Sequence, residues 1–301
     1  MSVGIKDMRA FCAIVEEGNI SHAAQRLDAA QPALSRQIKR IEEELGVKLF
    51  DRGARTIRLT EAGRVFYTRV EKIIGMLDGT IRELHDIGKG SGGSIRIGTI
   101  TTSGAMILPE LISRFHAQYP DVTFEIWESE GARILDMLDS RRIEIAVTRT
   151  AVDGENYGSL VLPHEPFVML MNANNSCGEK PNEVRISELK DWPLIIPLRW
   201  KSIFISSCRE RGFEPNIFCV SDSFVQGLLM VKMGLGIAMF PMSSQTLMMT
   251  DGDLICKRLV EPEMTTHTVV CWLKNQTLST ACKNFVKMFE RLFVEGRIDV
   301  D

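Results

Sequence analysis

The chain has 301 residues and a mass of 33.8 kDa, about twice the usual domain of ~150 residues, so at least two modules are expected. Its hydrophobic fraction of 45% and charged fraction of 25% exclude a disordered or fibrous chain. The longest apolar stretch, residues 227–242, is interrupted by Lys232 and three glycines and is too short for a membrane span. The start, MSVGIKDMRAF, lacks a signal pattern, and seven irregularly spaced cysteines favour reduced thiols. We therefore expect a cytoplasmic protein without a membrane partner.

The net charge of −3 is unevenly distributed along the chain. Residues 1–89 hold 15 Lys and Arg against 13 Asp and Glu, whereas the remainder holds 21 against 26. The bias is strongest over residues 31–69, with nine basic against five acidic side chains. A basic head on an acidic body suggests a nucleic-acid partner for the head.

Helical periodicity predicts three helices in the head. The first carries an apolar stripe at Met8, Phe11, Cys12 and Val15, with the i, i+3, i+4, i+7 spacing of an amphipathic helix. Ser21 is a candidate N-cap for a second, short helix with the sequence HAAQRL. Together with a third helix after a tight turn, these elements predict a helix-turn-helix.

The third helix, QPALSRQIKRIEEELG, is predicted to end at Gly46 as a left-handed cap. Its apolar positions fall on one face, which leaves the opposite face for contact with DNA. On that face Arg36 is expected to read base edges, and Lys39 to engage phosphates. The predicted DNA-binding residues of this helix are Gln31, Pro32, Ser35, Arg36 and Lys39.

The segments KLFDR and TIRLT are predicted to form the two short strands of a wing, joined at residues 53–55. Arg52 and Arg55 of this wing are expected to contact phosphates. Thr60 is then expected to cap a helix that reaches about Gly88. This helix would be ~40 Å long, too long for a head of about 60 residues to bury. We therefore expect it to dimerise through an apolar stripe of Phe66, Val70, Ile73, Leu77, Ile81 and Leu84.

The sequence resembles the LysR-type transcriptional regulators. The matching segments are AAQRL, QPALSRQIKRIEEELGVKLFDR and RLTEAG in the head, and RIG, ILPELISRFHAQYPDV and MGLGIAMFP in the body. One departure is Ala30, where the family commonly has a serine before Gln-Pro; this removes a side-chain cap worth about 1 kcal/mol. The resemblance implies a regulator that binds a double-stranded DNA operator as a homodimer or homotetramer.

The resemblance also implies the domain organisation and the fold class. The fold class is α/β with a helical winged helix-turn-helix head and a two-lobed body like that of periplasmic binding proteins. The expected domains are a DNA-binding head at 1–60, a linker helix and hinge at 61–93, and an effector-binding domain at 94–301. Within this domain, lobe I is expected to comprise residues 94–163 and 269–301, and lobe II residues 164–268.

The linker GKGSGG matches the dinucleotide pattern G-x-G-x-x-G, but it follows a helix and precedes a strand, so nucleotide binding is not expected there. In the body, strands and helices alternate, which predicts parallel α/β units. The expected strands are SIRIGTIT, VTFEIWE, IEIAVT, PFVMLM, PLIIP, IFCV, GIAMF and HTVVCWLK, with helices near residues 104–118, 132–140, 201–211, 223–233 and 278–294.

Open α/β sheets bind ligands at the carboxyl ends of their strands, and the candidate effector-binding residues are taken from those ends. The hydroxyl groups of Thr101, Thr102 and Ser103 precede a helix expected from about Gly104, whose N-terminus favours an anion. Simple N-capping is the alternative role for these hydroxyls. Family effector contacts fall on this loop, which favours Thr102.

Two arginines at other strand ends complete the candidate effector site. Thr148 and Arg149 end IEIAVT, and Arg199 follows PLIIP. An arginine at such a position can hold a carboxylate bidentately, or lie on the surface without a ligand. We therefore expect a small carboxylate effector between the lobes.

The sequence gives little support for catalysis, metals or cofactors, and we expect none of them. The five histidines lie at least 31 residues apart, and no G-x-S-x-G is present. Glu128 and Glu130 form an acidic pair that is expected to be solvated. The alternative within the regulator class is gating by cysteine oxidation, because one branch of the family uses a cysteine pair in the region of Cys208 and Cys219.

Overall fold

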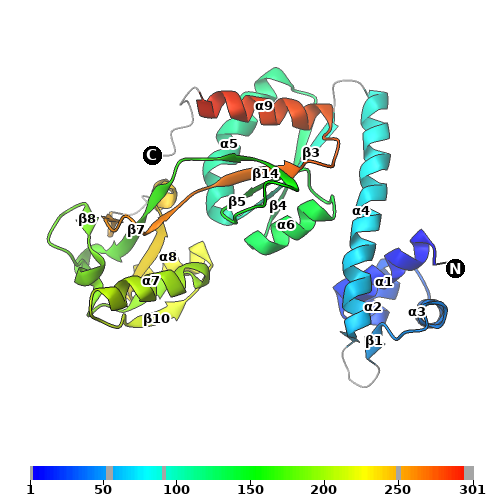
Figure 1. Ribbon diagram of the computed structural model, residues 1–301, viewed down its shortest axis with the longest axis horizontal. Helices are drawn as coiled ribbons and strands as arrows, with labels where there is room; N and C mark the ends of the chain where they lie inside the picture. Colours follow the sequence, from blue (N-terminus) through cyan, green and yellow to red (C-terminus); the bar gives the residue numbers. More distant parts are fainter. Residues whose placement is uncertain (1–2, 52–56, 90–92, 249–251, 295–301) are drawn as a thin grey trace. The chain divides into compact units, whose positions relative to one another are not determined.

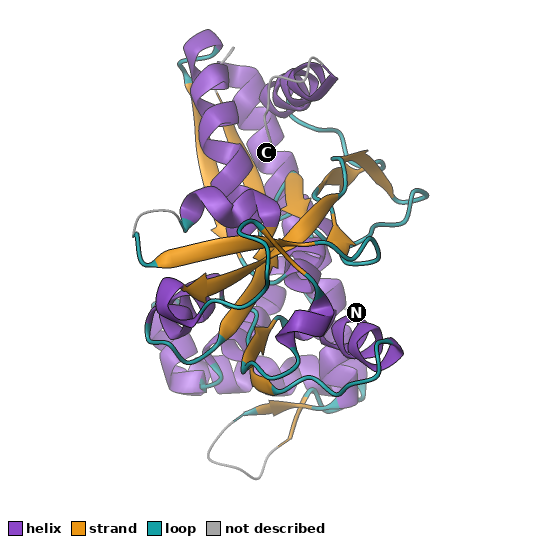
Figure 2. Ribbon diagram, turned by 90° about the vertical axis from the view of Figure 1, so that its left-hand side faces the viewer, coloured by secondary structure: helices purple, strands orange, loops and turns teal. Residues whose placement is uncertain are grey.

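The computed structural model describes residues 3–51, 57–89, 93–248 and 252–294. It divides into two compact units, one of residues 1–90 with 136–143 and one of residues 91–135 with 144–301. Figures 1 and 2 show the helices and strands of both units. Within the described ranges, no helix is long and apolar enough to cross a membrane.

The head has the three helices and the strand pair that the sequence predicts. Asn19, not Ser21, caps the second helix, because the Asn19 side chain accepts hydrogen bonds from the backbone N–H groups of Ser21 and His22. Gly18 and Gly46 have φ angles of +62° and +69°, the left-handed conformation that glycine adopts without strain. The elements are α1 (Ile5–Glu17), α2 (Ile20–Arg26), α3 (Gln31–Leu45), β1 (Phe50–Asp51), β2 (Arg58–Leu59) and α4 (Glu61–Lys89).

Phe11 is the centre of the head core. It is fully buried, and its ring centroid lies 5.1 Å from that of Phe50 and 5.0 Å from that of Phe66. These three residues come from α1, β1 and α4, so one aromatic cluster joins the helix-turn-helix, the wing base and the start of the long helix. Aromatic contacts of this kind each add about 0.5–1.5 kcal/mol beyond area burial.

Two buried carboxylates fix the recognition helix within the head. Asp7 of α1 accepts hydrogen bonds from Gln37 Nε2 at 2.8 Å and Arg40 Nη2 at 2.5 Å on α3. Burial would raise the pKa of Asp7, but hydrogen bonds from Gly4, Gln37 and Arg40, together with the charge of Arg40, lower it. These contacts hold α3 at a fixed rotation against α1.

Glu42 of α3 is the second of these carboxylates. Its Oε1 accepts the backbone N–H groups of Leu49 and Phe50 at 2.9 and 3.3 Å, and its Oε2 lies 2.9 Å from Lys48 Nζ. Burial opposes the ionised form, yet these donors lower the pKa of Glu42. One side chain therefore sets the direction in which the chain leaves α3 toward the wing.

Helix α4 begins where the sequence predicts. Thr60 Oγ1 accepts the backbone N–H of Gly63 at 2.9 Å, which caps the helix. Val70 is buried against the head core, whereas Ile73, Ile81 and Leu84 of the same stripe are 41%, 44% and 64% exposed. Beyond the first turns of α4, the apolar stripe is therefore exposed and not covered by other described residues.

The second unit contains two sheets. The first has the strand order β4-β3-β5-β14-β6, in which β3 pairs in parallel with β4 and β5, and β14 pairs antiparallel with β5 and β6. Helices α5 and α9 pack into one apolar cluster with these strands (Figure 1). The elements are β3 (Gly93–Thr99), α5 (Thr101–Gln118), β4 (Val122–Glu128), α6 (Gly131–Asp139), β5 (Ile145–Thr148), β6 (Tyr157–Val161), β14 (Val269–Leu273) and α9 (Thr280–Val294).

The second sheet follows the order β10-β9-β11-β7-β12-β8, with β13 also paired to β7. Strands β10, β9 and β11 are parallel, whereas β7 is antiparallel to β11, β12 and β13, so the expectation of a parallel unit is wrong here. The elements are β7 (Glu165–Asn172), η1 (Ala173–Asn175), β8 (Glu183–Val184), η2 (Ile186–Leu189), β9 (Leu194–Ile196), α7 (Leu198–Glu210), β10 (Ile217–Val220), α8 (Phe224–Lys232), β11 (Ile237–Pro241), η3 (Met242–Leu247), β12 (Leu254–Leu259) and β13 (Thr265–Thr266).

Alternating side chains of the second sheet pack into two separate hydrophobic cores. Phe167 and Met169 of β7 pack with α7, whereas Val168 and Leu170 pack with α8. Because successive side chains of a strand point to opposite faces, α7 and α8 cover opposite faces of this sheet. The fold class expected from the sequence is thereby confirmed: a helical head is followed by a two-lobed α/β body.

Candidate functional site

The outward face of α3 is the candidate DNA-binding surface. Gln31, Pro32, Arg36 and Lys39 are exposed, and Ser35 is half-buried. Arg36 has no ion pair within the described residues, whereas Lys39 Nζ lies 3.6 Å from Glu43 one turn along. Such an exposed pair is worth under about 1 kcal/mol, so it leaves Lys39 available to a phosphate. Ala30 provides no side-chain cap for α3, as the sequence predicts.

The wing is described only at its base. Phe50 pairs with Leu59 and Asp51 with Arg58 in antiparallel register, and Figure 2 draws the two short strands side by side. Arg52 and Arg55, the predicted phosphate contacts, lie outside the described residues.

A cavity of about 580 Å³ lies in the second unit at the carboxyl ends of strands from both sheets. The carboxyl ends of β3, β4 and β5, or the segments that follow them, line it from the first sheet, and those of β9, β10 and β11 line it from the second, together with Phe167 of β7. This is where open α/β sheets bind ligands. The lining residues are Ile100, Thr101, Thr102, Glu128, Ser129, Glu130, Gly131, Ala132, Arg149, Phe167, Pro197, Arg199, Trp200, Ser221, Asp222, Ser223, Phe224, Phe240 and Pro241.

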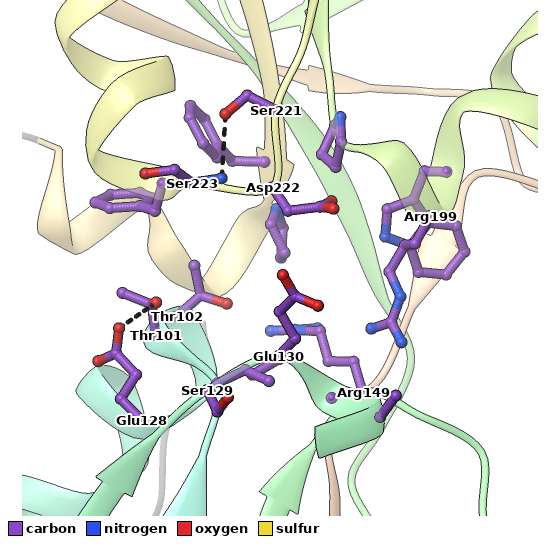
Figure 3. Close-up of a pocket in the computed structure, with 18 of the residues that line it drawn as sticks. Thr101, Thr102, Glu128, Ser129, Glu130, Arg149, Arg199, Ser221, Asp222 and Ser223 are labelled. Carbon is purple, nitrogen blue, oxygen red and sulfur yellow. Dashed lines mark hydrogen bonds between the residues drawn. The ribbon is translucent and has the colours of Figure 1, made fainter. Parts of the chain in front are cut away.

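Arg149 is the buried cation of the cavity (Figure 3). Its side chain is 3% exposed, and Nη2 lies 2.7 Å from Glu165 Oε1 and donates to Ser243 Oγ at 3.1 Å. Its Nε and Nη1 are buried without a hydrogen-bond partner among the described residues. Burial lowers the pKa of Arg149 although the charge of Glu165 opposes this. Half-satisfied buried guanidinium groups are costly, so the two free donors favour an anionic ligand.

Arg199 approaches from α7, on the other side of the cavity. Its Nη2 donates to Thr150 Oγ1 at 3.0 Å, and its guanidinium carbon lies 5.9 Å from the centroid of Trp200. Arg199 keeps exposed surface, yet the desolvation around its guanidinium lowers its pKa, an effect that the charge of Asp222 opposes. The described residues place no carboxylate within salt-bridge distance of it.

The predicted loop of hydroxyls is instead the first turn of a helix. Helix α5 begins at Thr101, three residues earlier than expected, and its N-cap Ile100 offers no side-chain bond. Thr101 and Thr102 line the cavity, and Thr101 Oγ1 donates to Glu128 Oε1 at 2.6 Å. Ser103 does not line it, because this residue is buried with its hydroxyl 3.0 Å from that of Thr268.

Thr148 is also absent from the cavity wall. It is fully buried, and its Oγ1 accepts the backbone N–H of Thr150 at 3.2 Å and lies 3.3 Å from Thr150 Oγ1. Thr148 therefore fixes the position of Thr150, which accepts the hydrogen bond from Arg199. A methyl group at Gly131 would lie 2.3 Å from Thr150 Oγ1, so the close packing here depends on glycine.

The cysteine pair considered for redox gating has no suitable geometry. Cys208 is fully buried, and burial raises its pKa to about 12, which opposes formation of the reactive thiolate. Cys208 packs in the core beside α7, whereas Cys219 packs in the core beside α8. The sheet therefore separates the two thiols.

Sequence reasoning missed part of the acidic wall of the cavity. Glu128 ends β4, Glu130 follows that strand and Asp222 follows β10, so the rule that selected Arg149 would also have selected them. The partner of Arg149, Glu165, has no comparable signal, because it begins a strand and its role depends on the pairing of distant segments.

The fold and the cavity define a class of protein: a helix-turn-helix head joined to a two-lobed body with a ligand-sized cavity. The family model "LysR substrate binding domain" matches residues 88–293, and the model "Bacterial regulatory helix-turn-helix protein, lysR family" matches residues 5–64. The chain belongs to the LysR family of transcriptional regulators: it is a DNA-binding regulator with an effector-binding domain, and this is not a family of enzymes.

Individual relatives agree with this assignment. The chain is 31% identical over 247 residues to the HTH-type transcriptional regulator BsdA of Bacillus subtilis (strain 168), covering 79% of this chain and 84% of BsdA. The crystal structure of the LysR family regulator CbnR has a TM-score of 0.75 at 20% identity, covering 96% of this chain and 99% of CbnR. The crystal structure of HinK, a LysR family regulator from Pseudomonas aeruginosa, has a TM-score of 0.58 at 26% identity, covering 97% of this chain and 99% of HinK.

Proposed function

We propose that this regulator is controlled by a small carboxylate effector bound in the cavity between its two sheets. The observation that carries the proposal is the pair of unpartnered donors on buried Arg149. A carboxylate that accepts these donors gains charge-assisted hydrogen bonds where water is largely excluded. Thr101 and Thr102 provide a second polar contact at the N-terminus of α5, which favours negative charge.

A ligand in this position bridges the two lobes. Arg149 follows β5 and Thr102 lies in the first turn of α5, in the lobe of the first sheet, whereas Arg199 of α7, Phe224 of α8 and Phe240 of β11 belong to the lobe of the second sheet. A ligand that contacts both lobes stabilises the arrangement in which they are close, and so shifts the equilibrium between open and closed forms. This shift is the proposed signal to the head.

The proposed partner of the head is a double-stranded DNA operator. Helix α3 is expected to enter the major groove, with Arg36 at base edges and Lys39 at phosphates. Full-length CbnR has been crystallised in complex with its target DNA, which supports DNA as the partner of the present chain. Two half-sites need two heads, so we propose a cytoplasmic homodimer or homotetramer that pairs through α4.

The test uses the full-length protein and a panel of small carboxylates. A ligand is first identified by its thermal shift, and its affinity is then measured by calorimetry for wild type, Thr102→Val and Thr123→Val. Thr123 is an exposed residue of β4 away from the cavity and provides a matched control. Losing the Thr102 hydroxyl should cost about 1–3 kcal/mol, a roughly ten- to hundredfold weaker Kd.

The control should bind the effector as wild type does. Unchanged affinity in Thr102→Val, or an effector that proves to be a cation or a peroxide, would overturn the placement of the effector in this cavity.

A further inference from the structure

The cavity contains more negative than positive charge. Two guanidinium groups, of Arg149 and Arg199, face three carboxylates, of Glu128, Glu130 and Asp222. The positive charge of Arg149 is already compensated by Glu165 at 2.7 Å. A ligand that carries only negative charge would therefore meet repulsion from the acidic wall while it binds the arginines.

The three carboxylates differ in what they already bind. Glu128 accepts the hydroxyl of Thr101, and Asp222 Oδ1 accepts the backbone N–H of Leu198 at 2.9 Å. The carboxylate of Glu130 has no hydrogen bond or ion pair within the described residues. Figure 3 shows the side chain of Glu130 extending from its own wall of the cavity toward the opposite side, where Asp222 lies. One comes from each sheet, so approach of the two lobes increases their repulsion unless a cation lies between them.

The cation that fits this position belongs to the ligand. The described residues contain no group of three or more His, Cys, Asp or Glu side chains that could hold a metal ion. An ammonium group offers three N–H donors to carboxylate oxygens, and it would join the pair from both lobes. The aromatic side chains of Phe167, Trp200, Phe224 and Phe240 provide apolar surface in the same cavity.

We propose that the effector is an α-amino acid with an apolar side chain. Its carboxylate binds the free donors of Arg149, its ammonium group lies between Glu130 and Asp222, and its side chain contacts the aromatic wall. This inference rests on the proposed function, because it specifies the chemistry of the ligand in the same cavity. The independent observation behind it is that the buried Nε and Nη1 of Arg149 have no hydrogen-bond partner among the described residues, which favours an anionic acceptor close to the acidic pair.

The test compares ligands that differ by one charged group. The probes are the apolar and aromatic protein amino acids, each beside its des-amino carboxylate and its decarboxylated amine. L-phenylalanine, 3-phenylpropionate and 2-phenylethylamine form one such set. Full-length wild type is titrated with each probe by calorimetry, and operator binding is measured with and without the probe. At least one amino acid should bind ten times more tightly than both of its truncated forms and should change operator affinity.

Variants then assign the ammonium group. Glu130→Gln and Asp222→Asn should each weaken binding of the amino acid at least tenfold. Glu130→Gln should at the same time bind the des-amino carboxylate as well as wild type or better, because one repulsive charge is removed. A general loss of structure would weaken both ligands. Glu125→Gln, an exposed change on β4 outside the cavity, is the control and should behave as wild type.

The outcomes separate the two proposals. If a des-amino carboxylate binds wild type as tightly as its amino acid and Thr102→Val weakens it, the carboxylate cavity stands and the amino-acid inference is overturned. If no probe of any series binds, both proposals are overturned. If Glu130→Gln weakens the amino acid and the des-amino acid equally, Glu130 does not hold the ammonium group and the inference is overturned.

Discussion

Removing Arg149 should destabilise the second unit strongly, because it leaves a buried carboxylate without its cation. In Arg149→Met, the side chain of Glu165, which is 11% exposed, keeps among its described partners only the backbone N–H and hydroxyl of Ser243, at 2.5 and 3.1 Å. Breaking a buried ion pair from one side costs about 3–5 kcal/mol. Since Ser243 still donates two hydrogen bonds, we expect the lower end, about 3 kcal/mol of unfolding free energy.

The double variant distinguishes the effect of breaking the ion pair from the effect of changed packing. In Arg149→Met with Glu165→Met, no unpaired charge remains, and replacement of a whole buried pair by apolar side chains is often close to neutral. We expect the double variant to lose about 1 kcal/mol, less than Arg149→Met alone. Glu165→Met alone leaves the guanidinium unpaired and should cost about as much as Arg149→Met.

The measurement is urea unfolding at pH 7 without ligand, followed by tryptophan fluorescence. This signal reports on the second unit, because the four tryptophans all belong to it: Trp127, Trp192, Trp200 and Trp272. A loss of about 3 kcal/mol corresponds to a melting temperature lower by ~6–12 °C for a domain of this size. A single-variant loss below about 1 kcal/mol, or a double variant that loses the sum of both singles, would refute the reasoning.

Three further predictions concern the head, the long helix and pH. Arg36→Ala should weaken binding of the cognate operator by about 1–3 kcal/mol and relax its specificity, whereas Lys39→Ala should weaken all sequences and flatten the salt dependence. Footprinting at two salt concentrations tests this, and equal losses for Arg36→Ala on cognate and random DNA would contradict it. Leu77→Glu and Ile81→Glu should sediment as monomers with little operator affinity, since Ile81 is 44% exposed; a dimer that binds normally would show that other surfaces pair. Burial, together with the nearby His164 and Arg149, lowers the pKa of His267 in the folded protein. The unfolded chain therefore binds protons more tightly than the folded protein, and stability should fall as pH decreases from about 6.5 through the folded pKa. His267→Gln should reduce the loss of melting temperature between pH 7.5 and 5.5. An equal loss in the variant would show that His267 does not cause this pH dependence.

The head could be predicted almost completely because its signals are local. Periodicity gave the buried face of α3, and Gly46 and Thr60 gave the ends of helices. A cap was misplaced at Ser21 because serine and asparagine are both good N-caps, and only the backbone shows which residue leaves the helix first.

The cavity could be predicted only in part because its residues come from six strand ends. The strand-end rule placed Arg149 and Arg199 near a ligand, and both line the cavity. It also selected Thr148 and Ser103, whose hydroxyls satisfy buried neighbours. Whether a strand-end side chain faces the cavity depends on the helix start and strand register to within one residue, which composition and spacing do not define.

The position of β14 has a consequence for synthesis of the protein. Strand β6 pairs only with β14 among the described strands, and about a hundred residues separate the two in the chain. While a ribosome is still making the intervening lobe, β5 and β6 both have unpaired edges, and such edges attract other chains. The inserted lobe can begin to fold as soon as it emerges, whereas the sheet that carries Arg149 closes only when the last strand arrives. A nascent chain is therefore exposed to aggregation from the synthesis of β6 until β14 has emerged, and the sheet beside the cavity is complete only after β14 has paired.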